Sequence, residues 1–313
     1  MHAARGILAA AGRHGRLLLI AGLAAGIFLP QAAGAVRPYI GELIAGLLFL
    51  ACVRIGPRQA IGAAADLGTG LKATLALQLV LPLVLAVTFR ALEWSGPTAL
   101  ALTLMASASP IAGSPSLVAM VGSDPAPALR QLVVGTALLP VTALAVFLLA
   151  PGLGGTGSLL LAAARLLFVI GCAAALGFAL RLTLLRELSP ERRDMIDGCS
   201  AILMAVVVVG LMSAVGETWP RAPQAVLATV AIAIAANFGL QVVTALVVAK
   251  AGAPHLAVSL GVSAGNRNVA LFLTALPAAT TDAALLFIGC YQIPMYLTPL
   301  VLGGFYKRLS PIR

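Results

Sequence analysis

Charged side chains are scarce in this sequence. Asp, Glu, Lys and Arg make up 10% of its 313 residues, whereas 61% are hydrophobic. A soluble domain carries about 25% charged and roughly 45–50% apolar residues. A chain this poor in charge cannot cover a water-facing surface, which excludes a soluble globular domain. We therefore predict an all-α polytopic membrane protein, in which each span uses about 20 mostly apolar residues.

Several catalytic motifs are also missing. The sequence has no GxxxxGK[ST] loop, which argues against intrinsic ATP hydrolysis, and its three histidines form no HExxH zinc site. No pair of mid-span aspartates is present for an aspartyl protease, and no histidine lies well inside a span to serve a serine nucleophile. The four cysteines form no CxxC pair and are interpreted as buried, small hydrophobic residues. We therefore expect no enzyme activity, no nucleic-acid partner, no protein partner and no confident metal site.

Ten apolar segments are present, bounded by charges, prolines and glycines. They run 17–35, 39–53, 67–89, 98–121, 132–150, 159–180, 199–215, 225–248, 256–277 and 283–306. A Gly-rich loop at 152–157 divides them into five and five, so we predict two repeats, 1–155 and 156–313. An alternative for the first segment is a cleaved signal peptide, because Arg5, Arg13 and Arg16 precede its apolar run.

The basic residues predict the orientation of the chain. With ten spans and a cytoplasmic N-terminus, 15 Lys and Arg residues lie on the cytoplasmic side and 4 on the other, namely Arg37, Arg90, Arg165 and Arg221. This asymmetry places both termini in the cytoplasm of a cell whose inner (plasma) membrane holds the protein. The polar stretch 181–197 is expected to be the central cytoplasmic loop.

Five spans per half place the two halves in opposite orientations, as inverted repeats. A weak similarity between the halves supports this prediction. The spacing from Ser109-Pro110 to Asp124 in the first half equals the spacing from Arg267-Asn268 to Asp282 in the second. Interrupted helices at corresponding places in two inverted halves point to the binding site of a transporter.

The fourth segment holds two prolines, a glycine and four serines, in Ser107-Ala-Ser-Pro-Ile-Ala-Gly-Ser-Pro-Ser116. Each proline removes a backbone donor, so we expect the helix to unwind from Ser109 to Ser116. Freed backbone groups in a bilayer are tolerated only where they are buried in protein or line a wet cavity. The alternative is a simple proline kink whose serines bond back to the helix.

The ninth segment carries Asn266, Arg267 and Asn268 between two apolar runs. An arginine at the centre of a span costs about 2.5–3.5 kcal/mol on the insertion scale, so it marks a functional site by default. We expect 265–268 to be non-helical and to meet the fourth-segment break near mid-membrane, with half-helix N-termini facing an anion. The alternatives are a surface loop at 265–268 and an Arg267 that snorkels to the surface.

Other mid-span polar residues lie in segments three to five and eight to ten: Gln78, Thr136, Asn237, Gln241, Gln292 and Thr298. Each alone is more often a helix–helix hydrogen bond than a ligand. Segments one, two, six and seven are nearly bare of such groups. The partition predicts a polar core unit and a more apolar panel unit.

Three stretches resemble the bile acid:sodium symporter family: ASASPIAGSPSLVAMVGSDPA, GVSAGNRNVALFLTALP and LKATLALQLVLPLVLA. The resemblance covers about residues 17–306. It implies ten helices in two inverted five-helix repeats, with helices 3–5 and 8–10 as a core and helices 1, 2, 6 and 7 as a panel. It also implies that broken helices 4 and 9 cross at a site for sodium and an organic anion.

The motifs depart from the family where sodium binds. Ser263 falls on its sodium-binding Glu, Arg267 on a Gln and Asn268 on an Asn, so that only Gln78 and Thr136 match sodium ligands. A hard cation prefers several oxygens with a carboxylate among them. We therefore predict that Arg267 supplies the positive charge instead, donating to unwound carbonyls or to a substrate carboxylate. The expected substrate-binding residues are Ser109, Pro110, Gly113, Ser114, Ser116, Asn266, Arg267, Asn268 and Gln292, and the cation-site remnant is Gln78, Thr136 and Ser263.

The leading hypothesis is a secondary active transporter of a small organic anion, working by alternating access without a cofactor. Three alternatives are open: a sodium-coupled symporter with a partial cation site, an arsenite-type efflux permease, and a passive channel. The arsenite permeases rely on a cysteine in the fourth helix, and here no cysteine lies between Cys52 and Cys172.

Overall fold

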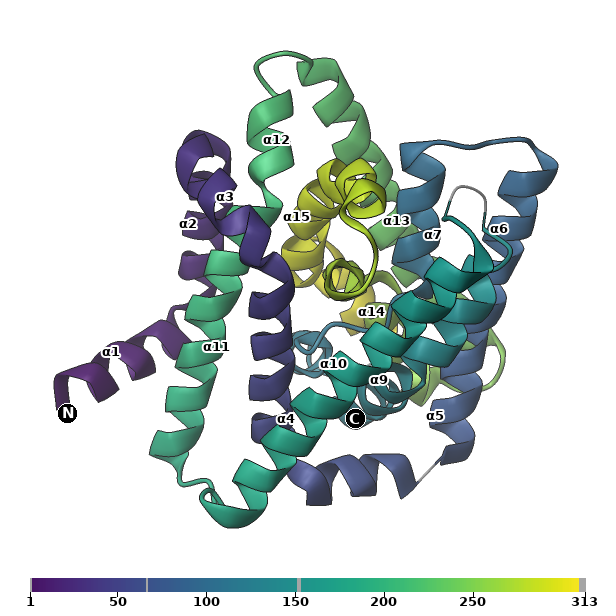
Figure 1. The fold of residues 1–313 in the computed structure, drawn as a ribbon. Helices are drawn as coiled ribbons and strands as arrows, with labels where there is room; N and C mark the ends of the chain where they lie inside the picture. The colour runs from purple at the N-terminus through teal and green to yellow at the C-terminus, as the bar shows by residue number, and fades with distance from the viewer. Residues whose placement is uncertain (1, 66, 151–152, 310–313) are drawn as a thin grey trace. The chain divides into compact units, whose positions relative to one another are not determined.

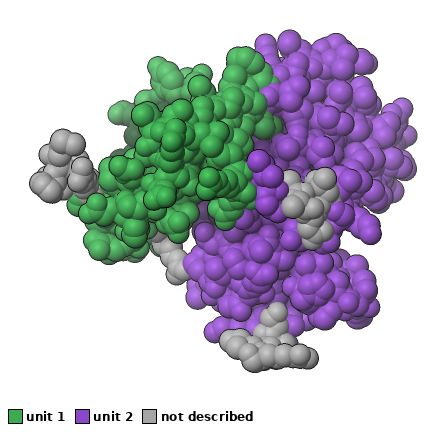
Figure 2. All heavy atoms as spheres, turned by 90° about the horizontal axis from the view of Figure 1, so that it is seen from below, with its two compact units in different colours: residues 1–60, 168–226 green, residues 61–167, 227–313 purple. Residues whose placement is uncertain are grey.

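In the computed structural model the chain is described over residues 2–65, 67–150 and 153–309, and over these ranges it is helical without strands (Figure 1). The chain divides into two compact units, each assembled from two stretches of sequence. Unit 1 comprises residues 1–60 and 168–226, and unit 2 comprises residues 61–167 and 227–313 (Figure 2). Each unit therefore combines parts of both predicted repeats.

Unit 1 is built from helices at the start and in the middle of the chain. They are α1 (His2–Arg13), α2 (Gly15–Phe28), α3 (Pro30–Val36), η1 (Arg37–Tyr39), most of α4 (Ile40–Ala65), the second part of α10 (Thr156–Thr183), α11 (Pro190–Leu211) and α12 (Ser213–Thr218). Small residues let these helices approach closely, as is usual in membranes. A Cβ at Gly22 of α2 would lie 2.7 Å from the carbonyl oxygen of Ala205 in α11.

Unit 2 holds most of the mid-span polar residues. Its elements are α5 (Leu67–Thr74), the π-helix η2 (Leu75–Val80), α6 (Leu81–Ala91), α7 (Pro97–Ser107), α8 (Ser114–Met120), α9 (Ala126–Phe147), the first part of α10, most of α13 (Pro223–Lys250), α14 (Pro254–Gly265), the 3₁₀ helix η3 (Val269–Thr274) and α15 (Ala278–Leu309). Val118 of α8, Val262 of α14 and Tyr306 of α15 belong to one buried apolar cluster. In this cluster α8 and α14, the two short helices beside the candidate site, pack together with α15.

Seven helices in the described ranges are long and apolar enough to cross a membrane, or eight if the bent pair 6–13 and 17–28 counts as one span. Large apolar side chains such as Phe28, Phe168 and Leu300 are 78%, 71% and 80% exposed, as lipid-facing residues are. The chain is therefore a multi-pass helical membrane protein. Ten spans, inverted repeats and the 155/156 boundary stay predictions, and the expected fourth and ninth segments are each split into shorter helices.

Some predicted boundaries were wrong. The first segment ends at Phe28 instead of at residue 35, because Pro30 starts a new helix and disfavours helical geometry at Leu29. The stretch 181–197 is not one loop. Ser189 caps α11 by accepting a hydrogen bond from the backbone of Arg192, so only residues 184–189 connect α10 to α11. Residue 152 of the Gly-rich loop, residue 151 before it and the C-terminal Arg313 lie outside the described ranges.

Candidate functional site

Both expected helix breaks are present, and both are shorter than predicted. α7 ends at Ser107 and α8 begins at Ser114, while α14 ends at Gly265 and η3 begins at Val269. Ser114, Pro115 and Ser116 are helical because proline is well tolerated in the first turn of a helix, where its missing N–H removes no internal hydrogen bond. Pro115 therefore starts α8, and Pro110 lies in the break.

The two breaks meet within unit 2, as predicted. Pro110 and Arg267 form an isolated antiparallel bridge. The amide of Ile111 donates to the carbonyl of Asn266 at 3.0 Å, and the amide of Asn268 donates to the carbonyl of Ser109 at 2.8 Å. These two bonds satisfy backbone groups that the breaks release from helices. We call residues 108–113 and 265–268 the crossing.

Arg267 lies in the middle of the crossing and is only 1% exposed. Its guanidinium donates to three main-chain carbonyls: Nε to Ala264 at 2.6 Å, Nη1 to Ala108 at 2.9 Å and Nη2 to Leu77 at 2.9 Å. Ala264 belongs to the second half of the sequence, and Leu77 and Ala108 belong to the first. One side chain therefore ties together backbone from three segments of unit 2.

Each of the three carbonyls is available for a physical reason. Ala108 follows the last residue of α7, and Ala264 is next to last in α14; the final carbonyls of a helix have no intrahelical partner. Leu77 lies in the π-helix, where its carbonyl would pair with the amide of residue 82, but residue 82 is Pro. Cations are also favoured at helix C-termini, where the helix dipole is negative.

This geometry decides among the predictions for Arg267. Snorkelling to the surface is wrong, because the side chain is buried. Donation to unwound carbonyls is confirmed. The groups that contact Arg267 are carbonyls at or beside the C-terminal ends of α7 and α14, and the expectation that half-helix N-termini face an anion stays a prediction.

A polar network surrounds the second break. Gln241 of α13 donates to Asn237 at 2.6 Å and to Thr298 of α15 at 3.0 Å, and it accepts from Tyr306 at 2.9 Å. Thr298 also donates to the side chain of Asn266 at 3.2 Å. Asn266 is therefore a buried structural residue of the network, and its own amide returns to α14.

Two tyrosines of α15 complete the site and were missed by sequence reasoning. Tyr306 belongs to the network around Gln241, and the Tyr291 hydroxyl donates to the carbonyl of Gly265. Both are fully buried. The available signal was a tyrosine inside an apolar span, because a buried tyrosine hydroxyl usually needs a hydrogen-bond partner.

The proposed cation-site remnant does not form one cluster of free ligands. The Gln78 amide donates to the carbonyl of Gly135 and to Thr142, both at 2.9 Å, and Thr136 is 3.4 Å from the hydroxyl of Ser109. Ser263 is buried, and its hydroxyl has no hydrogen-bond partner within the described ranges. Gln78 and Thr136 thus act as hydrogen-bond donors to different partners, and the three residues share no hydrogen bond with one another in the described ranges.

The other predicted substrate residues differ in accessibility. Ser116 is exposed and Gly113 and Asn268 are half-buried, whereas Ser109, Pro110 and Ser114 are buried. Gln292 is 5% exposed and donates to the carbonyl of Ile288 in its own helix. Of the predicted substrate residues, only Ser116, Gly113 and Asn268 therefore have surface that a ligand could contact directly near the crossing.

The chain matches no protein-family model and no curated protein. The resemblance to the bile acid:sodium symporter family therefore rests on the three sequence stretches alone.

Proposed function

We propose that this protein is a secondary active transporter of a small organic anion that works by alternating access and needs no sodium. The observation that carries the proposal is the buried Arg267 guanidinium, held by carbonyls from both halves of the sequence where two broken helices cross. Broken helices with freed backbone groups at a shared point are the usual architecture of transporter binding sites.

The sodium-independent part follows from what the three carbonyls contact. Carbonyl oxygens are good ligands for hard cations, but here a guanidinium occupies them and places a fixed positive charge beside them. A mobile cation would have to displace a tethered one. Arg267 thus acts as an internal replacement for a bound cation, which supports uncoupled or differently coupled transport over sodium symport.

The sign of the substrate follows from the charges at the crossing. No acidic residue occurs in 107–116 or 263–268, and Arg267 is the one charged residue in these stretches. Ser116, Asn268 and the backbone near Gly113 offer polar groups beside that charge. We assign these groups to substrate contact and assign Arg267 to positioning and to the electrostatic field, because each of its three side-chain nitrogens already donates to a carbonyl.

Transport into proteoliposomes tests the proposal. A panel of radiolabelled carboxylates should show saturable uptake and counterflow in both sodium chloride and choline chloride. Strict sodium dependence would reject the internal-cation mechanism and favour the symporter alternative. Unsaturable flux without counterflow would indicate a channel, and uptake restricted to arsenite would indicate the permease.

A sodium titration of an arginine variant separates the mechanism from the substrate question. In Arg267→Gln the three carbonyls lose their tethered cation, so sodium should raise the melting temperature of the variant and not that of the parent protein. Choline chloride at equal ionic strength is the control. Equal effects of sodium on the melting temperatures of both proteins would contradict the proposal that Arg267 takes the place of a bound cation.

The orientation is proposed from the basic residues: both termini cytoplasmic in a bacterial inner membrane. A single cysteine at Glu191, which is exposed in the first turn of α11, tests this in a background whose four native cysteines are replaced. A membrane-impermeant maleimide should label it only after the cells are opened. Labelling in intact cells would reverse the topology.

A further inference from the structure

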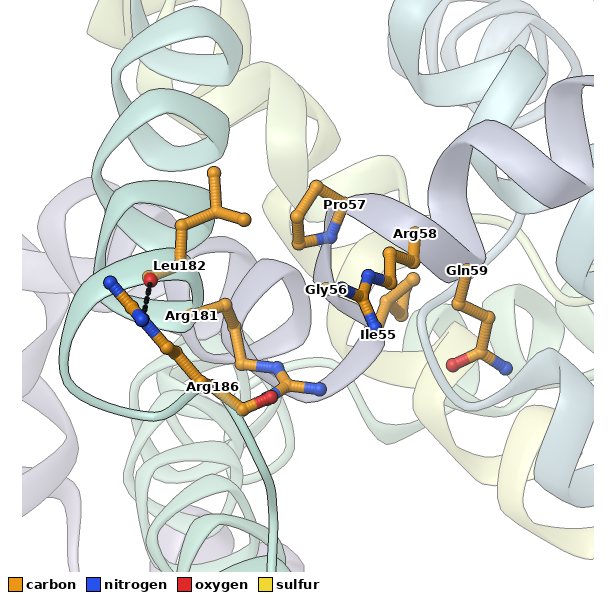
Figure 3. Close-up of a pocket in the computed structure, with 8 residues that line it drawn as sticks. All are labelled: Ile55, Gly56, Pro57, Arg58, Gln59, Arg181, Leu182 and Arg186. Carbon is orange, nitrogen blue, oxygen red and sulfur yellow. Dashed lines mark hydrogen bonds between the residues drawn. The ribbon is translucent and has the colours of Figure 1, made fainter.

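A cavity of about 400 Å³ in unit 1 is lined by three arginines and no acidic residue. Its lining residues are Ile55, Gly56, Pro57, Arg58, Gln59, Arg181, Leu182 and Arg186. Figure 3 shows the α4 residues facing the residues of α10 and the following turn. The volume is within the range of about 300–1,000 Å³ that small-molecule sites occupy.

The local sequence explains how the cavity forms. At Gly177, α10 packs so closely on α4 that a Cβ would lie 2.7 Å from the Cβ of Cys52. Four residues after Cys52, Gly56 adopts φ +74°, a left-handed conformation that favours glycine, and Pro57 follows it. The chain direction changes there, so the tightly packed pair of helices ends in an open space between Gly56 and the end of α10.

The arginines around this space have no acidic partner within it. Nearby Arg54 is already paired with Asp197, at 2.7 Å, and so lies outside the set. Arg186 donates from Nε to the carbonyl of Leu182 at 2.9 Å, and Arg181 donates from Nη1 to the carbonyls of Leu185 and Arg186. All of these acceptors are neutral, so they leave the positive charges uncompensated.

All three arginines have donors without an acceptor in the described part of the chain, and in Arg186 these are the Nη groups. The Arg58 side chain is exposed and makes no hydrogen bond within the described part of the chain, and the Nε of Arg181 is buried beside Gly56 without an acceptor there. A Cβ at Gly56 would lie 2.9 Å from that Nε, so glycine is what allows Arg181 to reach this wall. Unpaired guanidinium donors around one cavity match the several acceptor oxygens of a phosphate group.

We propose that this cavity binds the phosphate of an anionic membrane phospholipid. The predicted orientation places it at the cytoplasmic ends of α4 and α10, where anionic head groups attract clustered arginines. Apolar side chains adjoin it: Leu182 lines the cavity and is 55% exposed, and the neighbouring Leu184 is 74% exposed. An acyl chain can lie on these leucines while the phosphate contacts Arg58, Arg181 and Arg186. The proposal does not depend on what the protein transports.

Lipid binding to the purified protein tests it. Phosphatidylglycerol and phosphatidylcholine are titrated separately into detergent micelles, and binding is followed by native mass spectrometry and by the melting temperature. Phosphatidylglycerol should bind tightly and phosphatidylcholine weakly. The double variant Arg58→Gln/Arg186→Gln should bind phosphatidylglycerol about 25-fold more weakly, at about fivefold for each arginine removed.

The matched control is Arg193→Gln, an exposed arginine on the same predicted membrane face that does not line the cavity. It should bind phosphatidylglycerol like the parent protein. Equal losses of binding in the control and the double variant, or equal binding of the two lipids, would overturn the site.

A separate experiment replaces the lipid with inorganic phosphate or glycerol 3-phosphate. If these bind at similar concentrations and the binding depends on Arg58, the phosphate that the site recognises need not come from a lipid, which would overturn the lipid proposal. Arg58→Lys, which keeps the charge, should retain most of the binding, and a loss as large as that in Arg58→Gln would contradict a charge-based site.

Discussion

The α7/α8 segment and the α14/η3 segment both break after a short helix, of 11 residues in α7 and 12 in α14, and they join through a pair of backbone hydrogen bonds. They differ in what they contribute to the crossing. The first break supplies small side chains and a free carbonyl, whereas the second supplies Arg267, which binds carbonyls of both breaks. Backbone hydrogen bonds thus run in both directions between the two breaks, and the side chain of Arg267 adds one more from the second break to the first.

The surroundings of the breaks differ in the same way. A Cβ at Gly265 would lie 2.3 Å from the carbonyl oxygen of Asn237, whereas a Cβ at Gly113 would meet nothing nearer than Ile111 at 3.6 Å. The second break is held rigidly by α13 and α15, and the first is accessible on one side. This contrast predicts that the second break determines stability and the first determines ligand contact.

The largest effect is expected from Arg267→Gln. It removes the donor of three buried carbonyls, and each unpaired buried group costs about 1–3 kcal/mol, for a total of about 3–9 kcal/mol if all three are left unpaired. Reversible unfolding in mixed micelles measures the loss, and Arg267→Lys should recover part of it. Arg90→Gln, an exposed arginine of α6, is the control and should change stability by under about 0.5 kcal/mol. Similar stabilities for the two glutamine variants would contradict the bonding role of Arg267.

A second comparison uses the glycines. Gly265→Ala should destabilise the protein by about 1–3 kcal/mol or more, because the new methyl group overlaps backbone of α13. Gly113→Ala should have little effect, since its neighbour is at ordinary contact distance. Melting temperatures of the matched pair test this. Equal shifts would show that the two breaks are packed alike.

The amides that flank the breaks allow a third comparison. Gln241→Met removes three hydrogen bonds and leaves Tyr306 and Thr298 short of a partner, whereas Gln78→Met removes two. At about 1–3 kcal/mol per unpaired buried group, both variants should unfold more easily, and Gln241→Met more so. A larger loss of stability in Gln78→Met than in Gln241→Met would contradict the conclusion that the second break is the more rigidly held.

The smallest effect on stability is expected from Ser116→Ala. This serine is exposed and lies beside the first break, so its removal should leave the melting temperature unchanged. If its hydroxyl contacts substrate, transport affinity should fall by about two- to tenfold, the value of one ordinary hydrogen bond. Uptake kinetics measure it, and an unchanged affinity would remove Ser116 from the substrate site.

Sequence reasoning predicted some of the candidate site and not the rest. The prolines and the Asn-Arg-Asn triplet located both breaks, because proline cannot donate a backbone hydrogen bond and a buried arginine is costly. The hydrogen-bond partners of Arg267 were not predictable. Arg267 binds Leu77, which is 190 positions away in the chain, and nothing in its neighbouring residues specifies that carbonyl. Pro82 lies four residues after Gln78 in the sequence, but its consequence for the carbonyl of Leu77 depends on the π register of η2.

Composition alone determined that this is a helical membrane protein, since 61% hydrophobic residues with 10% charged ones can only be covered by lipid. Local patterns determined where its helices break, because the backbone chemistry of proline acts within one turn. Only the tertiary structure decided what Arg267 does. A guanidinium can reach the surface, a ligand or a carbonyl, and which of these wins depends on where the ends of α7, α14 and the π-helix meet. That meeting depends on how segments far apart in the chain pack together.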